Sequence, residues 1–395
     1  MSRASTPEGR ILFVDHAAVL GGAELSLLDI ATHFRDRGAV VLFEDGLFAQ
    51  ALVARGVAVI LLAAGSALKG VKKQSRVPGP AAVLTTLRSA LELARTARGF
   101  DLIYANSPKA FLVSVIAGMI AGRPVIWHLR DIISPAHFSR SNIRILVAVA
   151  NWRAVRVVAN SHATADAFVA AGARRDLMRV VHNGIDAAPF DSLPADARSV
   201  VRSALGISDD AFVVGSFSRL HPWKGQRVLL DALDRLPDVH GLIVGGALFS
   251  GEEAFEAELH ARVARAPLAG RVQMLGTRDD VPALIASCDV VVHTSVLPEP
   301  FGRVLVEALL ARRPLVASNA GGVLEIVEDG RTALLVTPGD ADALANAIAF
   351  VRDHPAEATA MSEAGSSDVR VRFTRATMLR GVTAVIDDAF AELGA

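Results

Sequence analysis

Two glutamates and a glycine pair stand close together in the stretch PEPFGRVLVEALLARRPLVASNAGG, residues 298–322. Glu299 precedes an apolar segment with helical periodicity, Glu307 lies inside it, and Gly321-Gly322 follows the next apolar run. A carboxylate among apolar side chains is costly unless a polar group pairs with it. Carboxylate oxygens accept hydrogen bonds from neutral diols, so we interpret both glutamates as ligands for a ribose or a hexose. The alternative is a helix-start charge at Glu299 and a solvated Glu307.

Two cations stand at the end of another apolar run. Arg219 and Lys224 belong to SRLHPWKG, which directly follows the buried-strand pattern FVVGSF at 212–217. Two cations at a strand end could clamp a diphosphate, because its oxygens accept hydrogen bonds from both side chains. The alternative interpretation is a pair of solvated cations on a loop.

Glycine pairs open two of the predicted helices. Gly21-Gly22 follows the first apolar run, and Gly321-Gly322 precedes the helical pattern around Glu325. Glycine lets backbone amides approach a ligand closely, and a helix N-terminus favours an anion, so both pairs are predicted phosphate cradles. For the first pair, a purely structural turn is the alternative. Two cradles, two cations and two diol acceptors together predict a pocket for a nucleoside-diphosphate sugar.

No metal and no cofactor is predicted for this pocket. The one D-x-D sequence, Asp340-Ala-Asp342, opens a helical pattern in which Asp340 fits an N-cap. The sequence holds no H-E-x-x-H and no paired C-x-x-C. Its single cysteine, Cys288, lies in the apolar run SCDVVVHTS and is expected to be a core thiol.

The elements that must position these residues alternate regularly through the 395 residues. Short apolar runs alternate with helical patterns, which predicts parallel sheets covered on both faces by helices. Ligands of such sheets bind outside the carboxyl ends of the strands, where the residues above stand. The predicted strands are 11–14, 40–44, 57–63, 101–106, 124–129, 155–161 and 178–186 in the first half, and 211–220, 239–246, 271–276, 290–295, 313–318 and 332–337 in the second.

A chain of this length favours two domains. We therefore predict an α/β protein with two doubly wound, Rossmann-like parallel-sheet domains that face a central cleft. An acceptor-binding domain is expected over residues 1–190 and a nucleotide-sugar-binding domain over 191–374, with a linker rich in Asp, Pro, Ala and Ser at 186–198. Residues 375–395 are expected to form a long amphipathic helix that packs back on the first domain.

The two halves differ in charge. Residues 1–190 hold 22 Lys and Arg against 13 Asp and Glu, whereas the remainder holds 19 against 28. The basic half is expected to face an anionic partner, with uneven surface charge of no function as the alternative. LKGVKKQSR, residues 68–76, places four cations together. We predict that it meets an anionic acceptor, such as a lipid-linked sugar phosphate at a membrane surface; a solvated loop is the alternative.

The hydropathy pattern bears on location. No apolar run reaches the roughly 18–20 residues that a membrane span needs. The polar N-terminus, MSRASTPEGR, lacks the apolar core of a signal peptide. We expect a cytoplasmic protein that contacts the inner face of the membrane only peripherally.

The chain resembles the retaining, nucleotide-sugar-dependent glycosyltransferases of family 4, also called glycosyl transferases group 1, which have the GT-B fold. The most specific shared element is Glu299-x7-Glu307 followed by residues 320–322, AGG. The resemblance also covers GGAE at 21–24, WHLRD at 127–131 and VHNGID at 181–186, and it extends to Gly330. Two departures are mild: Ser218 stands where glycine often precedes the arginine, and Leu324 where proline often follows the glycine pair.

The resemblance implies a role for each candidate residue. Glu299 would lie by the donor sugar, and Glu307 would bind the donor ribose. Arg219 and Lys224 would bind the diphosphate. His128 would position the transferred sugar or the acceptor rather than act as a general base. The implied catalytic residues are thus His128, Arg219, Lys224 and Glu299, and the implied donor-binding set is Gly21, Gly22, Arg219, Lys224, Glu299, Phe301, Gly302, Glu307, Gly321 and Gly322.

The implied activity is retaining, metal-independent transfer of a hexose from a UDP-sugar, or secondarily a GDP-sugar, to a hydroxyl acceptor. Such transfer would serve cell-surface glycan, glycolipid or secondary-metabolite biosynthesis and would involve no nucleic acid. Arg219, Lys224 and the amides of Gly321-Gly322 would stabilise the departing diphosphate. The alternatives are an epimerase and a nucleotide-sugar-binding protein that has lost transfer. A pyridoxal phosphate phosphorylase would need a Schiff-base lysine, and no lysine follows Lys224.

Overall fold

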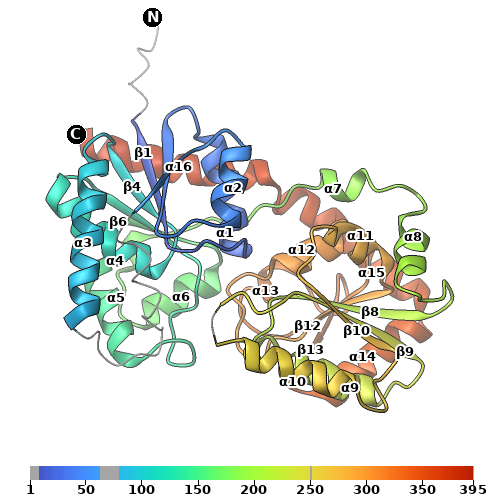
Figure 1. The fold of residues 1–395 in the computed structure, drawn as a ribbon. Helices are drawn as coiled ribbons and strands as arrows, with labels where there is room; N and C mark the ends of the chain where they lie inside the picture. Colours follow the sequence, from blue (N-terminus) through green and yellow to red (C-terminus); the bar gives the residue numbers. More distant parts are fainter. Residues whose placement is uncertain (1–8, 63–79, 250, 395) are drawn as a thin grey trace, which may run out of the picture. The chain divides into compact units, whose positions relative to one another are not determined.

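A computed structural model describes residues 9–62, 80–249 and 251–394 of the chain (Figure 1). The chain divides into two compact units. The N-terminal unit comprises Met1–Gly184 together with Arg375–Ala395, and the C-terminal unit comprises Ile185–Thr374. The first boundary between the two units, after Gly184, therefore lies shortly before residue 190, where the sequence predicted it.

The N-terminal unit is built on a seven-stranded sheet in the order β3-β2-β1-β4-β5-β6-β7. Every strand pair in it is parallel. The strand order reverses between β1 and β4, and ligands of doubly wound sheets bind at the carboxyl ends of such neighbours. The strands are β1 Ile11–Asp15, β2 Gly38–Leu42, β3 Ala58–Leu61, β4 Leu102–Ala105, β5 Val125–Leu129, β6 Ala154–Ala159 and β7 Met178–Val180.

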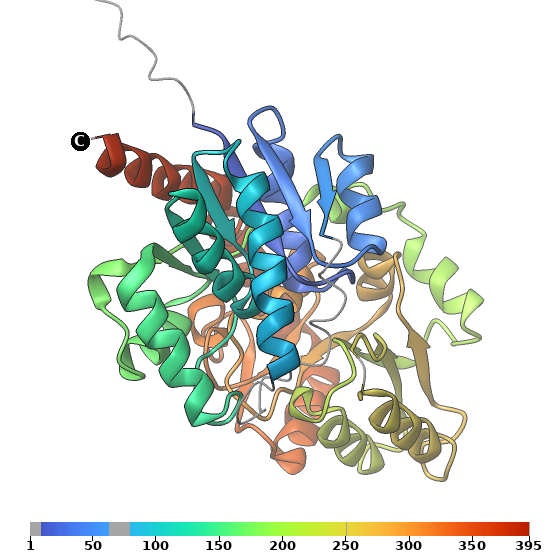
Figure 2. The ribbon, with the colours of Figure 1, turned by 60° about the vertical axis from the view of Figure 1, so that its left-hand side comes forward.

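Helices cover both faces of this sheet because successive strand side chains point to opposite sides. Leu12 and Val14 belong to a core with α3, α4 and α5, and Figure 2 shows α3 running in front of the strands. Ile11 and Phe13 belong to a core with α1, α2 and α16. The helices are α1 Gly22–His33, α2 Leu47–Ala54, α3 Pro80–Ala97, α4 Pro108–Ala121, α5 Arg140–Arg153, α6 His162–Ala170 and α16 Arg375–Gly394, with a 3-10 turn at Arg175–Leu177.

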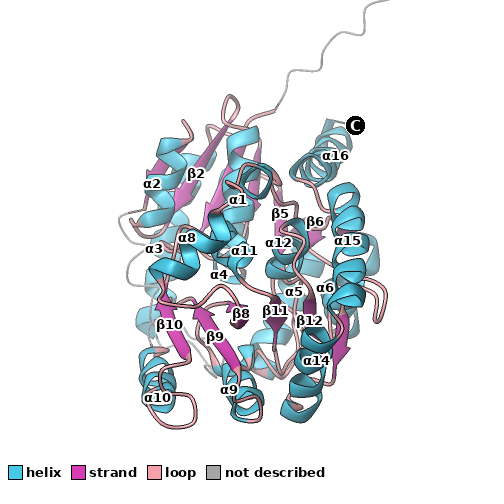
Figure 3. Cartoon of the chain, turned by 90° about the vertical axis from the view of Figure 1, so that its right-hand side faces the viewer, coloured by secondary structure: helices cyan, strands magenta, loops and turns pink. Residues whose placement is uncertain are grey.

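The C-terminal unit repeats the design with six parallel strands in the order β10-β9-β8-β11-β12-β13, most of which stand side by side in Figure 3. Val213 faces a core with α11, α12 and α15, and Val214 faces a core with α9, α10 and α14. The strands are β8 Phe212–Phe217, β9 Val239–Val244, β10 Val272–Gly276, β11 Val290–His293, β12 Leu315–Ser318 and β13 Leu334–Val336.

The helices of the C-terminal unit include two that the sequence did not predict. Residues 186–198, expected to be a linker, contain α7 and the start of α8. Phe190 and Val201 pack against the core there, and these two side chains hold the polar segment in place. The helices are α7 Ala188–Asp191, α8 Ala197–Ala204, η3 Pro222–Lys224, α9 Gln226–Asp234, α10 Glu253–Val263, α11 Val281–Ser287, α12 Arg303–Leu310, α13 Val323–Ile326, α14 Ala341–Asp353 and α15 Pro355–Arg372.

Three smaller expectations can be compared with the structure. Asp340 caps α14, because its side chain accepts a hydrogen bond from the amide of Ala343 at 2.8 Å. Cys288 is fully buried, and burial raises the pKa of its thiol to about 12. Among the described residues, none of the helices combines the length and the apolar character that crossing a membrane requires.

Candidate functional site

The loop after β8 is held against the end of β11. Gly225 has a φ of +73°, and a Cβ there would lie 1.9 Å from the carbonyl oxygen of Thr294, so only glycine fits. The hydroxyl of Thr294 in turn donates to the carbonyl oxygen of Lys224 at 2.8 Å. The backbone of Lys224 is thus fixed beside the carboxyl end of β11.

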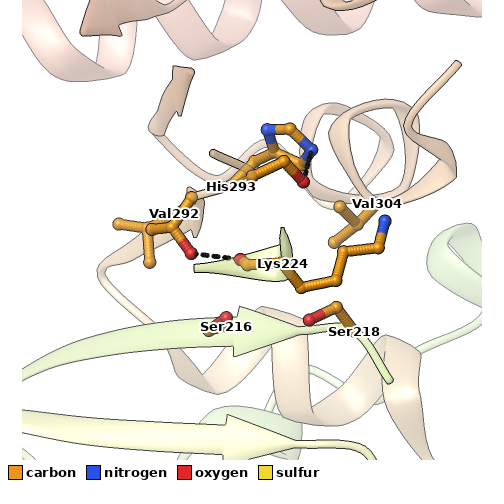
Figure 4. A pocket seen from close by; sticks show the side chains of 8 residues that line it. Ser216, Ser218, Lys224, Val292, His293 and Val304 are labelled. Carbon is orange, nitrogen blue, oxygen red and sulfur yellow. Dashed lines mark hydrogen bonds between the residues drawn. The ribbon is translucent and has the colours of Figure 1, made fainter. Parts of the chain in front are cut away.

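The side chain of Lys224 pairs with Glu299. Its Nζ lies 2.7 Å from Glu299 Oε2, and the same oxygen accepts a hydrogen bond from Ser295 Oγ at 2.9 Å. His293 Nε2 lies 3.1 Å from this oxygen as well. Figure 4 shows the small pocket beside this group, lined by Lys224, His293 and the side chains of Ser216 and Ser218 among others. Three polar groups therefore converge on one oxygen of a buried carboxylate.

This arrangement decides the charge of Glu299. Burial alone raises the pKa of the carboxyl, but the charge of Lys224 and the contacts with His293 outweigh it and hold the pKa well below its usual range. Burial lowers the pKa of Lys224, although the carboxylate of Glu299 opposes the shift. Glu299 is thus an anion at neutral pH, and an ionised carboxylate is able to accept hydrogen bonds from a diol.

The glycine pair Gly321-Gly322 supports the turn that carries Glu299. A Cβ on Gly321, whose φ is +68°, would lie 2.4 Å from the carbonyl oxygen of Glu299, and one on Gly322 would lie 2.5 Å from that of Pro300. The amide of Gly322 donates to the carbonyl oxygen of Glu299 at 2.7 Å. That amide was expected to cradle a phosphate. In this structure the N–H of Gly322 holds the turn that carries Glu299.

Arg219 lies on the same loop as Lys224. Its Nη1 donates to Glu252 Oε1 at 2.8 Å, and its guanidinium lies 5.3 Å from the centre of the Phe249 ring. The other oxygen of Glu252 accepts hydrogen bonds from the amides of Leu248 and Phe249. Glu252, which the sequence did not single out, therefore ties Arg219 to the segment after β9.

Glu307 projects from α12, which Gly302 caps at its N-terminus. Burial raises the pKa of its carboxyl, although Arg303, 3.5 Å away one helical turn earlier, opposes the shift. The ring of Phe301 is a core side chain, 2% exposed, and packs edge-to-face on Phe373. The structure therefore gives the Phe301 side chain a packing role.

His128 stands on β5 of the N-terminal unit, fully buried. Its Nδ1 lies 2.6 Å from the hydroxyl of Tyr104, and its Nε2 has no hydrogen-bond partner among the described residues. Burial raises the pKa of Tyr104 and lowers that of His128, so the phenol keeps its proton and the imidazole is neutral. A phenol that donates to Nδ1 gives its own hydrogen a partner and leaves the imidazole hydrogen on Nε2; Nδ1–H donating to the phenol oxygen is the other tautomer. With its hydrogen on Nε2, His128 is a hydrogen-bond donor, as a positioning residue requires.

The first glycine pair begins α1. The amide of Gly21 donates to Glu24 Oε2 at 3.0 Å, and Gly22 is the first helical residue. The Gly21 amide is thus engaged in a capping box. For this amide the structure matches the alternative interpretation, a structural turn rather than a phosphate cradle. Burial and the neighbouring Asp15 raise the pKa of Glu24 to about 8, while Gly21 and Arg130 oppose the shift.

Next to this turn, a second histidine is held at the end of β1. His16 Nδ1 lies 2.8 Å from Ser107 Oγ and 3.2 Å from Asp15 Oδ1. The other oxygen of Asp15 accepts a hydrogen bond from Asn106 at 2.6 Å. These residues were not predicted from the sequence, although they stand at or just after the carboxyl ends of β1 and β4.

Known proteins match both units. Residues 198–368 match the family Glycosyl transferases group 1, and residues 47–188 match Glycosyltransferase Family 4. The solved structure of the Anabaena protein Alr3699/HepE in complex with UDP and glucose has 40% sequence identity and a TM-score of 0.88, and the match covers 96% of this chain and 100% of that one. The chain belongs to glycosyltransferase family 4. Its two parallel sheets flanked by helices are the GT-B fold, as predicted.

Two curated relatives of this family 4 chain match over shorter stretches. The D-inositol 3-phosphate glycosyltransferase of Mycolicibacterium gilvum is 37% identical over 174 residues, which are 44% of this chain and 38% of the relative. The lipopolysaccharide core biosynthesis mannosyltransferase LpsB of Rhizobium meliloti is 30% identical over 214 residues, 53% of this chain and 60% of the relative. The chain thus matches less than two thirds of the length of these relatives.

The structure of this family 4 chain distributes the predicted residues over both units. Lys224 and Glu299 touch in the C-terminal unit, where Gly321 and Gly322 support them. The remaining members of the C-terminal set are Arg219, Phe301, Gly302 and Glu307, and those of the N-terminal unit are Gly21, Gly22 and His128. His293 and Ser295 were missed, although both stand in the quoted run SCDVVVHTS two residues apart, a spacing that puts extended side chains on one face.

Proposed function

We propose that the protein is a retaining glycosyltransferase that moves a hexose from a UDP-sugar, UDP-glucose first, to a hydroxyl acceptor. The observation that carries the proposal is the ionised, buried Glu299 paired with Lys224 at the carboxyl end of β11. The same Anabaena protein has also been solved with UDP-glucose, at 40% identity over 96% of this chain, which supports a UDP-sugar donor. A GDP-sugar is the second candidate, because LpsB is a mannosyltransferase by name.

In the proposed reaction the bond between the anomeric carbon and the β-phosphate oxygen breaks, and its electron pair stays on the phosphate. The acceptor oxygen forms a new bond to the same face of the sugar, and its proton passes to the departing phosphate. Arg219 and Lys224 stabilise the negative charge that grows on the diphosphate. Lys224 reaches that charge by turning from Glu299, and Glu299 then accepts hydrogen bonds from the sugar hydroxyls. The Nε2–H of His128 is the proposed donor to the sugar or acceptor.

Glu307 provides the test of the donor site. Replacing it with alanine removes the proposed acceptor for the ribose hydroxyls, and a hydrogen bond to a charged group is worth about 1.5–3 kcal/mol. UDP affinity should therefore fall by about 10–150-fold in calorimetry. Glu307→Gln is the comparison, since it removes the charge and keeps a side-chain oxygen that accepts hydrogen bonds. Unchanged UDP binding by Glu307→Ala would show that the ribose role is wrong, and tighter binding of GDP than of UDP would replace the proposed donor.

The acceptor is proposed to lie at an anionic surface. Residues 68–76, predicted to make this contact, are outside the described part of the chain. On α3, Leu84, Leu87 and Leu91 are 51%, 45% and 48% exposed. Arg88 and Arg95 are exposed on the same helix, and spacings of three, four and seven residues put them on the leucine face. Exposed leucines beside arginines suit a membrane with anionic lipids.

Liposome co-sedimentation tests this partner. Replacing the three leucines with serine should abolish binding to anionic vesicles at low salt and leave UDP binding unchanged. Val371 and Val200 of the C-terminal unit are 76% and 58% exposed, so a double serine variant there is the matched control. If the wild-type protein ignores such vesicles, the acceptor is a soluble molecule.

A further inference from the structure

Three donors converge on one atom at the centre of the C-terminal site. Glu299 Oε2 lies 2.7 Å from Lys224 Nζ, 2.9 Å from Ser295 Oγ and 3.1 Å from His293 Nε2. The side chain of Glu299 is 9% exposed, so its charge is stabilised by these groups rather than by water. The hydrogen bonds that Glu299 receives therefore decide both its charge and its orientation.

Two of the three donors stand at the end of β11 or just after it. His293 is the last residue of β11 and is 6% exposed, and Ser295 follows two residues later. Ser295 Oγ also lies 3.1 Å from His293 Nε2, so the two side chains and the carboxylate form a closed triangle. This triangle is built from one short segment, 293–299, whose turn is fixed by the Gly322 amide. None of its three contacts involves the side chain of Lys224.

The proposed function makes this independence important, and the following inference rests on that function. When a diphosphate binds, Lys224 turns to it and withdraws its charge from Glu299. A buried carboxylate that loses its cation must keep other donors or take up a proton. A protonated Glu299 would offer a hydroxyl where the sugar needs an acceptor.

We propose that His293 is a positioning residue that keeps Glu299 ionised and oriented while Lys224 serves the diphosphate. The imidazole carries its hydrogen on Nε2 and donates it to Glu299 Oε2, which leaves Oε1 to accept from the donor sugar. Ser295 assists through its hydroxyl. His293 touches neither the sugar nor the diphosphate in this arrangement, so it acts only through Glu299.

The test compares His293→Ala, His293→Gln and a matched packing control. Glutamine places an N–H near the position of Nε2 and should keep the hydrogen bond, whereas alanine removes it. Val290→Ala removes a buried side chain from the same strand on its opposite face. The probe is UDP-glucose in water, with release of UDP as the measure of turnover and calorimetry with UDP as the measure of binding.

The expected result is a split between turnover and binding. The kcat of His293→Ala should fall by about 10–150-fold, the effect of losing one hydrogen bond to a charged group. UDP affinity should stay within about threefold, and His293→Gln should recover most of the rate. Val290→Ala should retain its kcat when measured below its unfolding temperature.

Each contrary outcome has its own meaning. If the wild-type protein binds UDP and releases it from UDP-glucose, but His293→Ala is as fast, the positioning role is overturned alone. If His293→Ala and Val290→Ala lose rate equally, or if glutamine does not rescue, His293 only fills space. If the wild-type protein neither binds UDP nor releases it, the proposed function fails and the inference fails with it.

Discussion

Arg202 and Lys224 are cations of the C-terminal unit, and each is paired with a carboxylate. The Arg202 side chain is 1% exposed and that of Lys224 is 16% exposed. The guanidinium of Arg202 is fully buried and Nη2 donates to Asp289 Oδ2 at 2.8 Å. Its other groups donate to the backbone carbonyls of Ser208, Asp209, Ala211 and Ser287. Asp289 is equally engaged, since it also accepts from the amide of Val213 and from Arg198.

Lys224 is engaged much less completely. An ammonium has three hydrogens to donate, and the structure shows one carboxylate partner, Glu299, with the ring of Trp223 4.1 Å from Nζ. The donors around Glu299 all meet at Oε2. The Arg202 group is therefore satisfied by the fold itself, whereas the Lys224 group keeps capacity for a ligand. The two groups share a cation paired with a carboxylate, but Arg202 is more deeply buried and has more of its hydrogen bonds fulfilled than Lys224.

Removing Arg202 should give the largest effect on stability. Arg202→Met leaves the carbonyls around it and Asp289 without their donor, and breaking a buried pair costs about 3–5 kcal/mol. We expect a loss of this size in urea unfolding. The protein that remains folded should bind UDP with wild-type affinity. Arg198→Met is the control, because Arg198 meets the same Asp289 but is 35% exposed, and its loss should cost far less. A weaker UDP affinity in folded Arg202→Met would contradict the distinction between Arg202 as a structural cation and Lys224 as a ligand-binding one.

Removing Lys224 should weaken UDP binding and lower stability less than removing Arg202 does. Lys224→Met deletes a ligand for the diphosphate, so UDP affinity should fall by about 10–150-fold in calorimetry. Stability should fall less than in Arg202→Met, because Glu299 keeps the donors of His293 and Ser295 and is able to protonate. Arg227→Met, which breaks an exposed pair with Glu258 on the following helix, is the control. Were Lys224→Met to unfold readily while binding UDP normally, the pair would be structural after all.

The strands were predictable from sequence because strands buried on both faces are continuous apolar runs. All thirteen predicted runs contain or overlap an observed strand, from Ile11–Asp15 to Leu334–Val336. The helices α7 and α8 were not predicted, since Phe190 and Val201 are isolated apolar residues whose partners lie elsewhere in the chain. Local composition could not reveal those contacts.

At the site, residue types were predictable and their partners were not. Lys224 and Glu299 were assigned to different parts of one substrate, yet in the structure they pair directly across 75 residues of sequence. The glycine pair at Gly321-Gly322 was explained by a ligand, although backbone contact with the Glu299 turn already requires it. Both differences arise from contacts distant in sequence, which spacing alone does not encode.

A further prediction concerns the buried carboxylate Glu24, whose pKa is raised rather than lowered. Burial and the charge of Asp15 raise its pKa from 4.5 to about 8, whereas Glu299, beside Lys224, stays ionised. Below about pH 4.5 Glu24 is protonated in the folded and unfolded states alike, and its contribution to stability is complete. As the pH rises toward 8, the unfolded state ionises first, so the free energy of unfolding falls by at most about 1.4 kcal/mol per pH unit. Glu24→Gln keeps an acceptor for the Gly21 amide and does not titrate.

Urea unfolding of both proteins between pH 5 and 8 therefore checks the charge state of Glu24. The stability of Glu24→Gln relative to the wild type should rise steadily across this range. Glu357→Gln is the control, because it makes the same substitution at an exposed glutamate. Parallel curves for Glu24→Gln and the wild type would mean that Glu24 is already ionised in the folded protein. Arg130, which opposes the rise in the pKa of Glu24, would then keep that glutamate ionised, as Lys224 keeps Glu299 ionised in the C-terminal unit. Each unit would thus stabilise a buried glutamate by the charge of a cation.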